Sequence, residues 1–336
     1  MTTRVAVNGF GRIGRTITRI ALGRPDIEVV AVNDLADPEL LAHLFTYDST
    51  HGRLPTQVTV DGDAFVVGDR RIGVLRESNP AQLPWDTLGV DVVIESTGAF
   101  TDGSRAALHR QAGAGRVLIT APATNVDLTV VIGANEDAFD GSQYVISNAS
   151  CTTNCAALLA KTLHDAFGVR RGLMNTAHAY TSDQRLQDLP HKDFRRARAA
   201  ATNIIPTTTG AARAIGKVLP ALAGRLDGLA MRVPVIDGSV VDLTVELEAS
   251  VTVSEVNAVF QKAAEGELAD LLVYSEAPIV SADIVGTSAS CTFDAPLTMI
   301  SDRDGIGSIV KVVGWYDNEM GFSHRSVELA HILGSA

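Results

Sequence analysis

Cysteine, aromatic side chains and positive charge are all scarce in this chain of 336 residues. Three cysteines are too few, and odd in number, for a disulfide framework, which favours the reducing conditions of the cytoplasm. Lys and Arg number 28 against 39 Asp and Glu, and the net charge of −11 argues against nucleic acid as the principal partner. No apolar run approaches the length of a membrane-spanning helix, and no signal peptide precedes the first β-like segment. We therefore expect a cytoplasmic protein that has neither a membrane nor a nucleic acid as partner.

The length and the pattern of apolar residues predict two domains. In the first part of the chain, strand-like and helix-like segments alternate, and the strand-like runs are apolar on both faces. Such runs are typical of a parallel sheet covered by helices on each side. They lie at residues 29–32, 92–94, 117–119 and 128–132. The sequence thus predicts an α/β fold with a Rossmann-type doubly wound parallel sheet, and antiparallel hairpins inserted between residues 57 and 76.

After Cys151 the pattern changes to longer alternating strands at 227–235, 239–249 and 308–315, with helices near 210–218 and 254–267. This mixture predicts an α+β domain with a largely antiparallel sheet. We expect a nucleotide-binding domain at 1–149 and a catalytic domain at 150–315.

A glycine-rich turn follows the first strand. Gly9, Gly11 and Gly14 form G-x-G-x-x-G between a short apolar strand and a helix, the context that this motif requires for binding a dinucleotide. The first glycine allows the turn, the second lets the backbone approach a pyrophosphate, and the third lets the helix pack on the strand. Asp34 ends the next strand, where a carboxylate binds the adenosine ribose and repels a 2′-phosphate. The predicted cofactor is NAD rather than NADP.

Cys151 stands at a strand-to-helix junction, in the sequence Asn-Ala-Ser-Cys-Thr-Thr-Asn-Cys that runs from 148 to 155. A thiol in the first turn of a helix faces the positive end of the helix dipole and free backbone N–H groups, which stabilise the nucleophilic thiolate. The alternative is a small cysteine that only packs. Its polar neighbours argue against an apolar environment.

His178 follows a β-like run and lies among polar residues, as expected for a general base or acid paired with a cysteine. No histidine forms an i, i+4 pair with another, and Cys151 and Cys155 have no matching second pair. We therefore expect no metal site.

Several motifs in one order over almost the whole length carry a family resemblance. They are residues 8–15, 147–155, 178–181, 191–193, 203–206, 207–212, 231–234 and 315–319. The chain resembles the glyceraldehyde-3-phosphate dehydrogenases, the phosphorylating, NAD-dependent enzymes of glycolysis and gluconeogenesis. The resemblance implies oxidation of D-glyceraldehyde 3-phosphate to 1,3-bisphosphoglycerate with NAD and inorganic phosphate, through a thiohemiacetal and a thioester on Cys151.

The resemblance also implies roles for further residues. The substrate phosphate is expected at Thr181, Asp183, Arg195 and Arg232. Inorganic phosphate is expected at Ser150, Thr152, Thr209 and Gly210, with Arg195 serving both phosphates. Arg12, Ile13, Arg76, Thr120 and Asn318 are expected to contact the cofactor, Asn318 through the nicotinamide carboxamide.

Residues 180–203 form a long polar stretch without periodicity. A loop of this length in a compact domain is usually functional or held by a partner. In the family it packs against a neighbouring subunit, which implies a homotetramer, and Leu35 with Leu189-Pro190 resembles the NAD-specific form. The final helix, within 316–336, is expected to complete the nucleotide-binding domain, as it does in the family.

One segment departs from the family. Where it usually has Thr-Pro-Asn-Val after Met231-Arg-Val-Pro, this chain has Val235-Ile-Asp-Gly238. Because the segment follows Arg232, it can change the substrate phosphate site or mark a paralogue. The nearest alternative is erythrose-4-phosphate dehydrogenase, which the complete run 207–212 disfavours. A non-enzymatic redox sensor or RNA binder would not need both Cys151 and His178.

Overall fold

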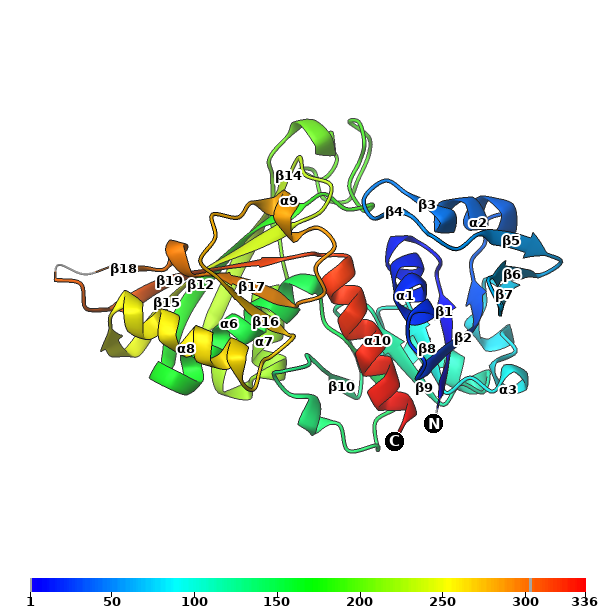
Figure 1. Cartoon of the computed structure of the whole chain (residues 1–336), viewed down its shortest axis with the longest axis horizontal. Coiled ribbons are helices and arrows are strands. Elements are labelled where there is room, and N and C mark those ends of the chain that lie inside the picture. Colours follow the sequence, from blue (N-terminus) through cyan, green and yellow to red (C-terminus); the bar gives the residue numbers. More distant parts are fainter. Residues whose placement is uncertain (1, 302–303) are drawn as a thin grey trace. The chain divides into compact units, whose positions relative to one another are not determined.

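Two units make up the computed structural model, which describes residues 2–301 and 304–336 (Figure 1). The first unit runs to Val130 and takes in Asp137–Ala149 and Ser323–Ala336. The second consists of Val131–Glu136 and Ser150–Phe322. The division in the middle of the chain therefore falls between Ala149 and Ser150, directly before Cys151.

The first unit is built on one sheet of order β10-β11-β9-β8-β1-β2-β7-β6-β5. All strands from β10 to β7 pair in parallel, and β7, β6 and β5 are antiparallel to one another. The strands are β1 (Thr3–Asn8), β2 (Ile27–Asn33), β5 (Val58–Asp61), β6 (Ala64–Val67), β7 (Arg70–Leu75), β8 (Val92–Glu95), β9 (Arg116–Ile119), β10 (Leu128–Thr129) and β11 (Val145–Ser147), with a separate hairpin of β3 (Tyr47–Asp48) and β4 (Gly52–Arg53).

The helices of this unit are α1 (Arg12–Leu22), α2 (Pro38–Thr46), α3 (Trp85–Leu88), α4 (Gly103–Ala106) and α5 (Leu108–Gln111). The chain passes from β1 to β2 on one side of the sheet and later returns to β8 on the other side of β1. This reversal is the point at which doubly wound folds bind ligands, outside the carboxyl ends of the strands. The hairpins expected between 57 and 76 are β5 to β7, and β7 also extends the parallel sheet beside β2.

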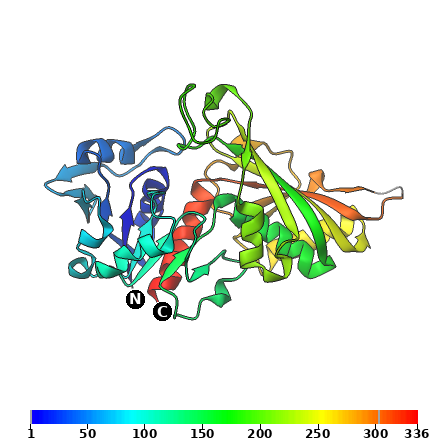
Figure 2. The ribbon, with the colours of Figure 1, turned by 180° about the vertical axis from the view of Figure 1, so that it is seen from behind.

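The second unit has a sheet of order β13-β14-β12-β15-β19-β17-β16, with β18 beside β19. Figure 2 shows this sheet from behind, with the long strands β12 and β14 side by side and parallel. The remaining pairings are antiparallel apart from β16 with β17. The strands are β12 (Val169–Ala179), β13 (Ile205–Thr208), β14 (Leu226–Val233), β15 (Ser239–Val251), β16 (Leu272–Ser275), β17 (Cys291–Asp294), β18 (Met299–Ser301) and β19 (Gly307–Tyr316).

Helix α6 (Cys151–Phe167) packs on this sheet and is buried along most of its length, which explains its small and apolar residues. The other helices of this unit are α7 (Ala211–Val218), α8 (Val253–Glu265) and α9 (Ser281–Ile284), whereas α10 (Met320–Gly334) belongs from Ser323 on to the first unit. The predicted fold class, a doubly wound parallel sheet with an α+β second part, is confirmed. Among the described helices, none is both long and apolar enough to span a membrane.

Candidate active site and cofactor-binding residues

The glycine turn between β1 and α1 is built for close approach of backbone atoms. Gly9 has a φ of +93°, and a Cβ there would lie 2.6 Å from the backbone nitrogen of Thr97. A Cβ on Gly14 would lie 2.1 Å from the Gly9 carbonyl oxygen. At Gly11 a Cβ would meet no protein atom within 4 Å, so the chain's own packing does not require a glycine there. No side chain caps α1, and its first turn therefore suits a pyrophosphate.

Asp34 lies against this turn. Its carboxylate accepts hydrogen bonds from the backbone N–H of Phe10 at 2.8 Å and of Ala36 at 3.1 Å. Arg76 reaches the same loop, donating to the Leu35 carbonyl at 3.3 Å. The sequence-predicted ribose carboxylate thus stands beside the predicted pyrophosphate turn, held by backbone donors.

The other predicted cofactor residues occupy the same edge of the sheet, except one. Arg12 opens α1 and pairs with Asp48 at 3.1 Å, and Ile13 follows it in the first turn. Thr120 follows β9 and donates its hydroxyl to the Glu95 carbonyl at 3.1 Å. Asn318 belongs to the second unit.

Cys151 is the first residue of α6, as the sequence predicts. Ser150 caps this helix by accepting the N–H of Thr153 at 3.0 Å, and Ala149 before it has a φ of +54°. A non-glycine residue at positive φ costs energy and is typical of sharply turned functional loops. Cys151 is half-buried, whereas Cys155 and Cys291 are fully buried. The thiol with access to a ligand is therefore Cys151.

His178 faces this thiol from β12. Its Nε2 lies 3.4 Å from Cys151 Sγ, and its Nδ1 lies 2.7 Å from the Ala179 carbonyl oxygen. Arg232 occupies the register position opposite His178 on β14, and its Nη1 lies 2.8 Å from Nδ1 and 3.0 Å from the same carbonyl. The parallel pairing of β12 and β14 therefore brings the predicted nucleophile, base and phosphate-binding arginine into one cluster.

Burial makes a single charge in this cluster unfavourable. It raises the pKa of the Cys151 thiol to about 11, although Arg232 and the Thr152 N–H act in the opposite direction. Burial and the charge of Arg232 lower the pKa of His178 to about 3. The helix start alone thus does not produce the thiolate that the sequence suggests. A proton that passes from Sγ to Nε2 creates both charges together, 3.4 Å apart, so each stabilises the other.

The arginine that joins this cluster from the long loop is Arg196. Its Nη1 lies 2.5 Å from the Asp183 carboxylate, and its Nε donates to the Thr207 hydroxyl at 2.9 Å. Thr181 donates to the same carboxylate. Arg195 is exposed, and its backbone N–H donates to the Asp193 carboxylate at 2.8 Å. The loop has no periodicity from which to choose between two adjacent arginines, so sequence reasoning placed Arg195 there and missed Arg196 and Thr207.

The remaining predicted phosphate residues lie at two helix starts. Ser150 and Thr152 flank Cys151, and the Thr152 hydroxyl is hydrogen-bonded to Tyr316 at 2.8 Å. Thr209 and Gly210 precede α7, where Thr209 Oγ1 accepts the Ala211 N–H at 3.2 Å. A helix start with so little side-chain capping retains donors for an anion.

Asn318 is connected to the backbone next to His178. Its Oδ1 accepts a hydrogen bond from Ser239 at 2.6 Å, and Ser239 in turn accepts the Ala179 N–H at 3.1 Å. The side-chain amide of Asn318 is thereby fixed relative to the Cys151 cluster.

The departing segment, Val235–Gly238, forms a tight turn after β14. The Tyr180 N–H donates to the Val235 carbonyl at 3.1 Å, and Gly238 has a φ of +84°. Burial, together with the carboxylates of Asp317 and Glu319, raises the pKa of Asp237 to about 8. The segment thus introduces a buried acid close to the site, while Arg232 keeps its position opposite His178.

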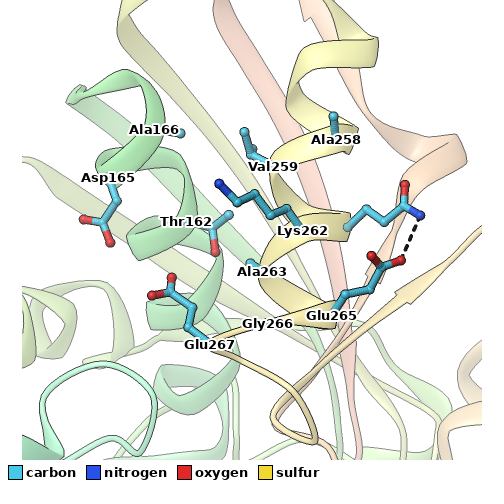
Figure 3. A pocket seen from close by; sticks show the side chains of 11 residues that line it. Thr162, Asp165, Ala166, Ala258, Val259, Lys262, Ala263, Glu265, Gly266 and Glu267 are labelled. Atoms are coloured by element: carbon cyan, nitrogen blue, oxygen red, sulfur yellow. Dashed lines mark hydrogen bonds between the residues drawn. The ribbon is translucent and has the colours of Figure 1, made fainter.

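A groove of about 840 Å³ lies elsewhere in the second unit, between α6 and α8 (Figure 3). Lys262 extends across it, with the carboxylates of Asp165 and Glu267 at its rim. None of the predicted site residues lines this groove. Its lining carries charges of both signs and includes neither Cys151 nor His178, so we assign the groove no part in the chemistry.

Comparison with known proteins gives matches over both parts of the chain. Residues 3–103 match the sequence profile of the NAD-binding domain of glyceraldehyde 3-phosphate dehydrogenase, and residues 150–318 match that of its C-terminal domain. Glyceraldehyde-3-phosphate dehydrogenase 1 of Streptomyces avermitilis is 58% identical over 336 residues, covering 99% of each chain.

Two further bacterial relatives are similar over almost their full lengths. The glyceraldehyde-3-phosphate dehydrogenase of Geobacillus stearothermophilus is 58% identical over 336 residues, covering 100% of this chain and 99% of the relative. Glyceraldehyde-3-phosphate dehydrogenase 1 of Bacillus subtilis strain 168 is 56% identical, with 98% of each chain covered.

Proposed function

Because this chain belongs to the glyceraldehyde-3-phosphate dehydrogenase family, we propose that its Cys151–His178–Arg232 cluster is the active site. The chain is an NAD-dependent oxidoreductase that converts D-glyceraldehyde 3-phosphate and inorganic phosphate to 1,3-bisphosphoglycerate in glycolysis or gluconeogenesis. The relatives carry this name, so erythrose-4-phosphate dehydrogenase is not favoured. The observation that carries the assignment of the site is the 3.4 Å approach of His178 Nε2 to a half-buried thiol at the start of α6.

Cys151 is the nucleophile in this proposal. His178 takes the thiol proton as Sγ bonds to the aldehyde carbon, and returns it to the carbonyl oxygen to give the thiohemiacetal hydroxyl. It accepts that proton again as the hydride leaves and the thiohemiacetal becomes a thioester. The backbone N–H groups at the start of α6 stabilise the negative oxygen. An oxygen of inorganic phosphate then attacks the thioester carbon, the C–S bond breaks, and the Cys151 thiolate is regenerated.

NAD supplies the acceptor for the hydride that leaves the aldehyde carbon. In the first unit, Gly9, Gly11 and Gly14 with Arg12 and Ile13 are proposed to hold its pyrophosphate. The donors at the start of α1 and the open space at Gly11 fit this group.

Three other residues complete the proposed NAD site of the first unit. Asp34 is proposed to bind the adenosine ribose hydroxyls, with Arg76 and Thr120 as further contacts. The Asp34 carboxylate is held in place by backbone N–H groups, and its negative charge would repel the 2′-phosphate of NADP. In the second unit, Asn318 is proposed to orient the nicotinamide carboxamide, because Ser239 fixes its amide.

The two phosphate sites are proposed around the same cluster. Thr181 and Arg232 bind the substrate phosphate, and Ser150, Thr152, Thr209 and Gly210 bind the inorganic phosphate. We propose Arg196 between them, in the role that the family resemblance implies for Arg195, because its guanidinium contacts both Asp183 and Thr207. Asp183, as a carboxylate, holds Arg196 rather than an anion.

The domain roles and the assembly belong to the same proposal. Residues 1–149 with the final helix within 316–336 bind NAD, and residues 150–315 carry the chemistry. The long loop exposes Leu186 at 80% and Phe194 at 89%, although hydrogen bonds such as Leu189 N–H to the Ala197 carbonyl brace it. Apolar side chains so exposed favour a contact with a second copy, and we propose a cytoplasmic homotetramer.

The experiment that tests this function measures the rate of NADH formation from glyceraldehyde 3-phosphate and NAD at increasing phosphate concentrations.

 The rate of NADH formation should rise with phosphate and saturate, because the thioester on Cys151 must be released by phosphate at every turnover. Erythrose 4-phosphate is the matched control and should give a much lower kcat/KM. A rate with glyceraldehyde 3-phosphate that does not depend on phosphate would contradict the proposal.

A further inference from the structure

Glu95, at the carboxyl end of β8, is buried in the first unit at the point where the strand order reverses. One carboxyl oxygen accepts the Asn8 amide at 2.5 Å and faces His109 Nε2 at 3.2 Å. The other accepts the Thr97 N–H at 2.8 Å and the Thr97 hydroxyl. Two of these partners, Asn8 and His109, are oriented by further hydrogen bonds of their own.

The backbone fixes Asn8 as a donor. The Glu77 N–H donates to Asn33 Oδ1 at 2.9 Å, and Asn33 Nδ2 donates to the Glu77 carbonyl at 2.8 Å. Because this sets the direction of the Asn33 amide, its Nδ2 also donates to Asn8 Oδ1 at 2.6 Å, which leaves the Asn8 NH₂ group to face Glu95.

The indole of Trp85 fixes His109 in the same way. An indole N–H can only donate, and it lies 3.0 Å from His109 Nδ1. Nδ1 therefore accepts, and the proton of the neutral ring is on Nε2, where it points to Glu95.

Donors thus converge on Glu95 from three directions, which is the arrangement that a carboxylate requires. None of them is a lysine or arginine, and His109 is neutral in this tautomer. Among the described residues, no Lys or Arg forms an ion pair with Glu95. The strand ends therefore hold one buried negative charge that hydrogen bonds satisfy and no cation neutralises.

This charge lies on one particular side of the proposed NAD site. Asp34, for the adenosine ribose, directly follows β2, and the pyrophosphate turn follows β1. In a doubly wound sheet the other half of the dinucleotide continues past β1 to the strand on its far side. That strand is β8, which ends in Glu95.

We infer that Glu95 is a specificity-determining residue that favours the positively charged nicotinamide of NAD⁺ over the neutral dihydronicotinamide of NADH. It also positions the segment after β8, because it holds Thr97, and Ser96 beside it donates to the Gly9 carbonyl at 2.7 Å. This inference rests on NAD binding at the strand ends of the first unit.

The test compares dissociation constants for NAD⁺, NADH and ADP-ribose, which lacks the nicotinamide, in the full chain without aldehyde or phosphate. Glu95→Gln removes the charge and also presents an NH₂ group where Thr97 needs an acceptor. It should weaken NAD⁺ about three-fold more than NADH, while ADP-ribose weakens only as much as NADH. Thr97→Val, at an exposed residue, is the matched control, because it loosens the same segment and keeps the charge of Glu95. It should weaken all three ligands equally.

An unchanged ratio of the NAD⁺ and NADH constants in Glu95→Gln would overturn the inference, and so would an equal change of that ratio in Thr97→Val. Glu95→Asp covers the case in which Glu95→Gln does not fold, since it keeps the charge but retracts it from Thr97. Its ratio should stay at the wild-type value, and a changed ratio would contradict the inference. Because these are binding measurements, they are read independently of whether the chain forms NADH from glyceraldehyde 3-phosphate.

Discussion

Replacing Asp237 by asparagine should stabilise the protein at alkaline pH and leave it unchanged at acidic pH. Burial and the neighbouring carboxylates of Asp317 and Glu319 raise the pKa of Asp237 from 3.8 to about 8. The folded state therefore holds a proton that the unfolded chain releases near pH 4. The contribution of Asp237 to the free energy of unfolding is fully present below about pH 4 and falls as the pH rises from about 4 to about 8. Above about pH 8 it stays at its lowest value.

The size of the effect follows from the size of the shift. The full shift from 3.8 to about 8 corresponds to about 5–6 kcal/mol if Asp237 alone carries it. Because Asp317 shares the interaction, we expect Asp237→Asn to recover about 2–3 kcal/mol at pH 8, which is several degrees in melting temperature.

The assay is thermal and urea unfolding at pH 5, 6.5 and 8, with Asp227→Asn as the matched control. Asp227 accepts the N–H of the glycine after it at 2.8 Å, as Asp237 does, but Asp227 is exposed. The control should change stability by no more than about 0.5 kcal/mol at any pH. The reasoning is refuted if Asp237→Asn is no more stable than the wild type at pH 8, or if its gain is the same at pH 5.

Four further outcomes follow from the proposed site. Cys151→Ser should lose nearly all dehydrogenase activity and Cys155→Ser little, and iodoacetate should label Cys151 first, so that earlier labelling of the buried Cys291 would contradict the assignment. Arg196→Ala should raise the KM for phosphate about ten-fold or more through loss of a charged contact, whereas Arg195→Ala should leave it near the wild-type value. Replacing Asp34-Leu35 by Gly-Thr and Leu189-Pro190 by Ala-Ser should lower the KM for NADP, and a wild type that already uses both cofactors would refute this account. Light scattering at micromolar protein should give a tetramer, and NAD should raise its melting temperature, while a fully active monomer would show that the long loop needs no second copy.

The fold could be predicted from the sequence where local patterns determine it. The strand before Gly9, the turn and the helix after Gly14 are adjacent in the chain, and steric limits on the two glycines require the turn. A helix start close to Cys151 could likewise be predicted, because the residues from Cys155 on are good helix formers with apolar side chains at helical spacing.

The rest depends on contacts between distant segments, which no local pattern encodes. The choice of Arg196 over Arg195 depends on the path of an irregular loop past Asp183 and Thr207. The donors around Glu95 come from three separate segments of the first unit. The pKa of Cys151 was expected to be low from its helix start alone, and burial instead raises it, because desolvation outweighs the charge of Arg232 and the Thr152 N–H.

The most direct test of the central claim is a single turnover without phosphate. Cys151 should then take up the acyl group and keep it, because nothing else in the proposed reaction releases the thioester. Rapid mixing of the protein with excess NAD and glyceraldehyde 3-phosphate should give a burst of one NADH per chain, with the acyl group found on the Cys151 peptide by mass spectrometry. Added phosphate should restore steady turnover and remove the acyl group. The absence of a burst, or an acyl group on any other residue, would contradict the account.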